Sequence, residues 1–151
     1  MTDEGAGDLL DVNVWLALAV EEHPHHDTAR TYWATHATRP RFFCRLSAMS
    51  LVRLLSHPRL MADRPLSLGK AWGVFEAFAA LPGVTMLHEP QGVDATLGAL
   101  VKGKLPGRLF TDAYFAALAR VAGLRLVTFD KDFERFAGLA NLRLAHQQRN
   151  A

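Results

Sequence analysis

The sequence predicts an α/β fold: a three-layer α/β/α sandwich in which helices cover both faces of a central, mainly parallel sheet. Short apolar runs that are typical of buried strands alternate with segments whose apolar residues recur at helical spacing. Pairs containing Pro or Gly separate these segments. We find no internal repeat, linker or low-complexity segment, so residues 1–151 are expected to form a single domain.

The first part of the chain is expected to form a strand, two helices and a second strand. Residues 8–12 follow the turn-like EGAGD and indicate a strand, and residues 13–22 indicate a helix that ends at His23-Pro24. Because proline is favourable in a first helical turn, the next helix is expected from about residue 24 to residue 37. The apolar run RFFC, residues 41–44, predicts another strand.

Two helices and a third strand are expected in the middle of the chain. Residues 47–56 carry leucines on one helical face, and His57-Pro58 ends that helix. Ser67 is a suitable N-cap for the following helix, which Pro82-Gly83 ends. The run VTML, residues 84–87, then predicts a strand.

The last third of the chain is expected to contain two helices and two strands. Residues 93–101 suit a helix, and Thr111 is expected to cap a second helix that Gly123 closes. The remaining elements are a strand at 124–129, a short turn at 132–136 and a strand at 142–145.

Composition limits the class of protein. Half of the residues are hydrophobic and 21% are charged, which is typical of a soluble globular protein and argues against disorder. No apolar run approaches the roughly 18 residues that cross a bilayer, so no membrane partner is expected. The acidic start MTDEGAGDLL lacks the apolar core of a signal peptide. Cys44 is the single cysteine, which excludes an internal disulfide and favours a reducing, cytoplasmic location.

Positive charge is concentrated in two segments without Asp or Glu. Residues 28–62 contain six arginines, of which Arg45 and Arg53 are expected near the carboxyl ends of the strands. Residues 95–111 contain Lys102, Lys104 and Arg108. Such segments suit a phosphate backbone or an acidic protein segment, but an ordinary solvated face explains the charge equally well.

Three aspartates are expected at one edge of the sheet. Asp11 ends the first strand, Asp112 begins a late helix, and Asp130 follows the strand LRLVTF. In parallel sheets, functional groups gather beyond the carboxyl ends of the strands. Each of these acids alone suits a helix cap or a turn, so it is their recurrence that predicts a site.

A divalent cation would relieve the repulsion among three close carboxylates. Ligands that are all oxygen, without a Cys or His cluster, suit Mg²⁺ or Mn²⁺ better than zinc. Such a metal can activate water and stabilise charged phosphate oxygens, which suits phosphoryl chemistry.

Three segments carry a family resemblance: LLDVNVWLAL at 9–18, TDAYFAALA at 111–119 and VTFDKDF at 127–133. In this order and spacing they resemble PIN-domain ribonucleases, in particular VapC-type toxins of bacterial toxin–antitoxin systems. The resemblance extends to HPHHDTARTYW at 23–33 and CRLSAMSLVRLLSHPRL at 44–60, and so covers nearly the whole chain. It implies a compact α/β fold whose carboxylates bind Mg²⁺ and cut single-stranded RNA, often tRNA.

The resemblance also assigns roles to residues. Asp11, Asp112 and Asp130 match metal-binding aspartates, and Asp132 matches an outer acid. Asn13 and Thr128 match polar positions that orient ligands or a water. Charge and expected position, rather than the resemblance, give the residues expected to contact RNA: Arg45, Arg53, Lys102, Lys104 and Arg108.

One position departs from the family pattern. Many relatives have a Glu in the third helix that completes a set of four carboxylates, whereas RLSAMSLVRLL at 45–55 contains no acid. Ser47 or Ser50 is expected to take part of that role.

Two alternatives differ from the nuclease interpretation. A haloacid-dehalogenase-type phosphatase needs Asp-x-Asp near the amino terminus, whereas this chain has Asp11-Val12-Asn13, and Asn cannot act as the general acid. A degenerate PIN module would bind RNA or protein without cutting. The nuclease interpretation implies a VapB-type antitoxin partner and a homodimer.

Overall fold

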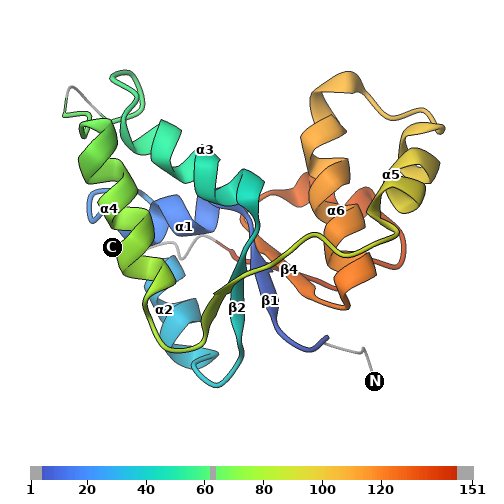
Figure 1. The fold of residues 1–151 in the computed structure, drawn as a ribbon, viewed down its shortest axis with the longest axis horizontal. Coiled ribbons are helices and arrows are strands. Elements are labelled where there is room, and N and C mark those ends of the chain that lie inside the picture. Colours follow the sequence, from blue (N-terminus) through green and yellow to red (C-terminus); the bar gives the residue numbers. More distant parts are fainter. Residues whose placement is uncertain (1–4, 62–63, 146–151) are drawn as a thin grey trace.

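The computed structural model describes residues 5–61 and 64–145, which form a five-stranded parallel sheet flanked by helices (Figure 1). The strand order is β3-β2-β1-β4-β5, and all four neighbouring pairs are parallel. The predicted α/β class is therefore confirmed, and the sheet is wholly rather than mainly parallel in these residues. The strands are β1 (Asp8–Leu10), β2 (Arg41–Phe43), β3 (Val84–Met86), β4 (Arg125–Thr128) and β5 (Asn141–Arg143).

Helices form the two outer layers of the molecule. The α-helices are α1 (Val12–Ala19), α2 (His26–Thr35), α3 (Arg45–Leu55), α4 (Leu68–Ala79), α5 (Val93–Val101) and α6 (Phe110–Ala122). Two short 3₁₀ helices, η1 (Gly107–Leu109) and η2 (Lys131–Arg135), precede α6 and follow β4. Among the described residues, no helix combines the length and apolar character that spanning a bilayer requires.

Each face of the sheet has its own hydrophobic core. In β1, Leu9 packs with residues of α5 and α6, whereas Leu10 packs with residues of α1 to α4. Successive side chains of a strand point to opposite faces, so the continuous apolar pattern of β1 matches a strand buried on both sides. Figure 1 shows the same division, with α1 to α4 on one side of β1 and β2 and with α5 and α6 on the other.

Two of the three helix ends for which the sequence predicts a capping residue have that residue at the cap. The Ser67 side chain accepts a hydrogen bond from the Lys70 amide at the start of α4, as predicted. Gly123 ends α6 with φ of 69°, a left-handed conformation that glycine adopts without strain. The predicted Thr111 cap is wrong: α6 begins at Phe110, directly after η1, with Leu109 at the N-cap and no side-chain cap.

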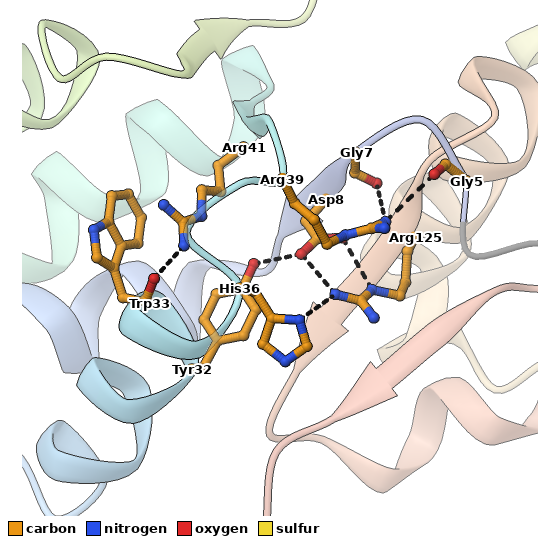
Figure 2. Close-up of polar contacts among 9 residues, drawn as sticks. All are labelled: Gly5, Gly7, Asp8, Tyr32, Trp33, His36, Arg39, Arg41 and Arg125. Carbon is orange, nitrogen blue, oxygen red and sulfur yellow. Dashed lines mark hydrogen bonds and ion pairs between the residues drawn. The ribbon is translucent and has the colours of Figure 1, made fainter.

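A buried ion-pair network holds the amino-terminal ends of β1 and β4 together (Figure 2). The fully buried Asp8 accepts hydrogen bonds from Arg125 at 2.9 Å, from Arg39 at 2.8 Å and from the Tyr32 hydroxyl at 2.6 Å. Asp8 and Arg125 are also partners in the strand register. The network therefore fixes the alignment of the two strands that carry Asp11 and Thr128 at their other ends.

Candidate active site

Asp11 lies at the carboxyl end of β1, where the chain enters α1. Its carboxylate accepts a 2.7 Å hydrogen bond from the Val12 amide and a 2.7 Å hydrogen bond from the Thr128 hydroxyl. Only 7% of the residue is exposed. Asp11 therefore caps α1, the alternative role that its position suggested, but the cap uses only part of the acceptor capacity of two carboxylate oxygens.

Thr128 connects the ends of β1 and β4. Its hydroxyl donates to Asp11 and accepts a 2.9 Å hydrogen bond from the Asp130 amide. Asn13 supports this link, because its side-chain oxygen accepts from the Phe129 amide at 3.4 Å and its nitrogen lies 3.5 Å from the Thr128 hydroxyl. The two polar residues expected near the site thus orient Asp11 and the backbone that leads to Asp130.

Three further carboxylates lie close together beside Asp11. One oxygen each of Asp112, Asp130 and Asp132 lies within 4.8 Å of the others. Asp112 lies in the first turn of α6, while Asp130 caps η2 by accepting a 2.8 Å hydrogen bond from the Asp132 amide. The tight turn of η2 thereby brings Asp132, which was expected only as an outer acid, into the same cluster.

The carboxylates act on one another electrostatically. Burial, followed by the charges of Asp11, Asp130 and Asp132, raises the pKa of Asp112 to about 6. Burial also raises the pKa of Asp11, against the hydrogen bonds from Thr128 and Val12, and the charge of Asp130 raises that pKa further. Neighbouring carboxylates thus disfavour the charged forms of Asp112 and Asp11. Three close carboxylates with oxygen ligands fit a divalent cation such as Mg²⁺ or Mn²⁺.

The expected contribution of Ser47 is limited by its own contacts. Ser47 is fully buried, and its hydroxyl accepts from the Cys44 amide and donates to the Cys44 carbonyl at the start of α3. Its oxygen therefore takes part in the capping box of α3, and its hydrogen is donated to the Cys44 carbonyl. Ser50 is half-buried one turn further along α3.

The basic residues differ in how close they come to the carboxylates. Arg108 forms an ion pair with Asp132 at 3.4 Å, and its charge opposes the rise in the pKa of Asp112. Lys102 and Lys104 are exposed between α5 and η1. The other two arginines expected to contact RNA, Arg45 and Arg53, are exposed on α3, and no ion pair joins either of them to the cluster among the described residues.

Comparison with known proteins places this chain in a family. The model of the PIN domain matches residues 9–139. The chain is 35% identical over 137 residues to Ribonuclease VapC41 of Mycobacterium tuberculosis, with 87% of this chain and 94% of that protein covered.

Two solved structures share the fold. The crystal structure of Mycobacterium tuberculosis VapC20, described as a sarcin–ricin loop cleaving toxin, superposes with a TM-score of 0.68 at 22% identity and covers 91% of this chain and 99% of that one. The crystal structure of VapBC2 from Rickettsia felis, bound to a DNA fragment from its promoter, superposes with a TM-score of 0.68 at 14% identity. The match covers 91% of this chain and 98% of that chain.

Fold, site and sequence thus define a PIN-like α/β/α protein, and the chain belongs to the PIN-domain family. Within that family it is a member of the VapC type.

Sequence reasoning missed the buried network around Asp8. The signal was present, because Asp8 and Arg125 are the single charges at the starts of two apolar strands. Their pairing depends on β1 lying next to β4, which the order of elements along the chain does not show.

Proposed function

We propose that this chain is a Mg²⁺-dependent endoribonuclease toxin, with Mn²⁺ as an alternative metal, that cuts single-stranded RNA such as tRNA. As a VapC-type PIN protein it is a nuclease that acts on RNA. The observation that best supports a dependence on metal is the group of three close carboxylates, Asp112, Asp130 and Asp132, which lies beside Asp11.

Each residue of the site has a role in this proposal. Asp112, Asp130 and Asp132 would hold the cation, and Asp11 would complete its ligands from the end of β1. A bound divalent ion activates a water and stabilises the charge on phosphate oxygens. Thr128 and Asn13 keep Asp11 and the turn before Asp130 in position. Arg108 offsets part of the negative charge that would repel RNA.

The two alternatives differ in what they require. Asn13 is bound to the backbone of Phe129 and cannot supply the proton that a haloacid-dehalogenase-type phosphatase needs. A degenerate PIN module would not need four mutually repelling carboxylates, and the acid missing from α3 is the observation that favours it.

An assay of RNA cleavage by the purified protein distinguishes the nuclease from the phosphatase and from the degenerate PIN module. We expect single-stranded RNA to be cut when Mg²⁺ is present, cutting to stop with EDTA, and excess Mg²⁺ to restore it. RNA that is bound but never cut in Mg²⁺ or Mn²⁺ would support the degenerate module. Hydrolysis of a small phosphate monoester, without RNA cleavage, would support the phosphatase.

We further propose that a VapB-type antitoxin controls the enzyme in the cytoplasm. Among structures with this fold, one is a VapBC2 complex. An Arg of the antitoxin would pair with the carboxylates and compete with the metal. If the inhibited complex kept its full Mg²⁺ affinity, inhibition would act elsewhere.

A homodimer of this single PIN domain, residues 1–151, is part of the same proposal. Large apolar side chains are exposed on α3, on the loop after it and on α4: Met49 is 60% exposed, Leu60 57%, Leu68 67% and Trp72 42%. Exposed apolar surface of this kind is typical of a contact with another protein.

A further inference from the structure

A second charged region lies outside the carboxylate site, on the side of the molecule that carries α6 and η2. It is an open hollow of about 460 Å³. Lys104, Arg120 and Arg135 line it together with apolar residues that include Leu105 and Phe136, and none of its lining residues is acidic. All three basic residues are exposed.

The three cations of this basic hollow lack acidic partners in the part of the chain that the structure describes. Among the described residues, the charged groups of Lys104, Arg120 and Arg135 form no hydrogen bond or ion pair. Other arginines of the chain do have such partners: Arg125 pairs with Asp8, and Arg143 with Glu134. Like charges around one hollow create a positive potential that attracts an anion.

The basic hollow is connected to the carboxylate cluster by two short elements. η2 has Asp132 near its start and Arg135 at its end, and a 3₁₀ helix rises about 2 Å per residue, so about 6 Å of helix separates them. α6 has Asp112 in its first turn and Arg120 in its last, which is about 12 Å at 1.5 Å per residue. An RNA strand cut at the carboxylates would therefore pass close to the basic hollow.

We propose that the basic hollow binds the phosphodiester backbone of the RNA next to the cleaved position. This inference depends on the proposed function, because it assumes that RNA is the substrate. The site is sequence-independent: arginine and lysine would contact phosphate oxygens, and the apolar floor leaves room for a sugar. Arg120 and Arg135 thereby join Lys104 as RNA contacts.

The salt dependence of RNA binding tests this site. The Asp112→Asn variant serves as background, because we expect it to bind RNA without cutting it. In that background we compare Arg120→Gln/Arg135→Gln with Arg30→Gln/Arg59→Gln, which removes the same charge from exposed positions elsewhere. The probe is a fluorescent single-stranded RNA of twelve nucleotides.

Each phosphate contact contributes about 0.7 to the slope of log K against log salt for single strands. The hollow variant should therefore lose about 1.4 from the slope, and the control variant much less. Arg120→Lys/Arg135→Lys should keep the slope, because its charge is retained. With Asp112 intact, the hollow variant should raise KM and leave kcat and Mn²⁺ affinity nearly unchanged.

The possible failures are distinguishable. If the background protein does not bind RNA and the wild type does not cut it, the proposed function is wrong. If RNA is bound and cut but the hollow variant keeps the slope of the control, the basic hollow is not an RNA site. That last result would also be expected if the hollow bound an acidic protein segment instead.

Discussion

The hydroxyl of Thr128 is the contact through which the two central strands define the site. It donates to Asp11 and accepts from the amide of Asp130, so it orients two of the carboxylates at once. Residues that orient metal ligands typically contribute 10- to 100-fold to metal affinity. We expect Thr128→Val, which keeps the side-chain shape, to weaken Mn²⁺ binding by about that factor.

Calorimetric titration of Mn²⁺ measures this effect. Thr31→Val is the matched control, because it removes an exposed hydroxyl that bonds only within α2. Unchanged Mn²⁺ affinity in Thr128→Val would show that the hydroxyl does not position the ligands.

Asp112 gives the metal-free protein a pH dependence with a definite sign. Burial and the neighbouring acids raise its pKa to about 6, from 3.8. The folded protein therefore retains a proton there that the unfolded chain releases, and the stability from Asp112 is lost as pH rises through about 6. Asp112→Asn should raise the thermal midpoint in EDTA at pH 7.5 and give a smaller increase at pH 4.5. An equal increase at both pH values, or a decrease at pH 7.5, would contradict the charge repulsion.

Among the helices and strands, the sequence predicted the position of a site residue wherever a local pattern alone fixes the end of an element. Asp11 and Asp130 could be predicted at one edge, because Asp11 directly follows β1, Asp130 lies two residues after β4, and parallel strands end at the same edge. Asp112 could be predicted because it lies in the first turn of a long amphipathic helix. These rules identify the ends of elements, which is where the site lies.

Other features depend on tertiary contacts that no local pattern contains. The start of α6 was placed too late, because η1 leads directly into the helix and makes a Thr111 cap unnecessary. The position of Asp132 in the cluster depends on the tight turn of η2. The partnership of Asp8 with Arg125 depends on which strands are neighbours.

That partnership predicts a large loss of stability in Asp8→Asn. Burial raises the pKa of Asp8, but hydrogen bonds from Arg125, Tyr32 and Arg39 outweigh it and hold the pKa below its ordinary value. Removing one partner of a buried ion pair typically costs about 3–5 kcal/mol. We expect a loss of that size at pH 7 in urea unfolding. The loss should shrink as pH falls below 3.8, where the carboxyl group of the unfolded chain takes up a proton, and should be smallest below the lower pKa of Asp8 in the folded protein.

Asp94→Asn is the control for Asp8→Asn, because Asp94 is exposed at the start of α5 and should change stability by less than about 1 kcal/mol. An Asp8→Asn variant as stable as this control would mean that the network does not hold β1 and β4 together.

For the whole molecule, the exposed apolar surface of α3 and α4 predicts where two copies would meet in the proposed homodimer. Leu68→Lys/Trp72→Lys places charges at two exposed apolar positions of α4 and should convert the proposed dimer into a monomer in sedimentation velocity. Val101→Lys is the control, because it changes an exposed apolar residue on α5 and should leave the dimer intact. A wild-type monomer at all concentrations, or a dimer unaffected by the double change, would contradict a dimer through this surface.

If the four aspartates hold a divalent metal that is required to cut RNA, cleavage depends on these residues and on Mg²⁺ together. We would measure the rate of RNA cleavage against Mg²⁺ concentration for the wild type, Asp112→Asn and Glu134→Gln. Glu134 is a matched control, because it is an exposed acid on η2 whose ion pair is with Arg143. We predict that Asp112→Asn lowers the rate at subsaturating Mg²⁺ by more than about 100-fold, since a direct ligand contributes more than a supporting residue, and that Glu134→Gln stays within about twofold of the wild type. Equal rates and equal Mg²⁺ dependence in all three proteins would contradict this role of the aspartates.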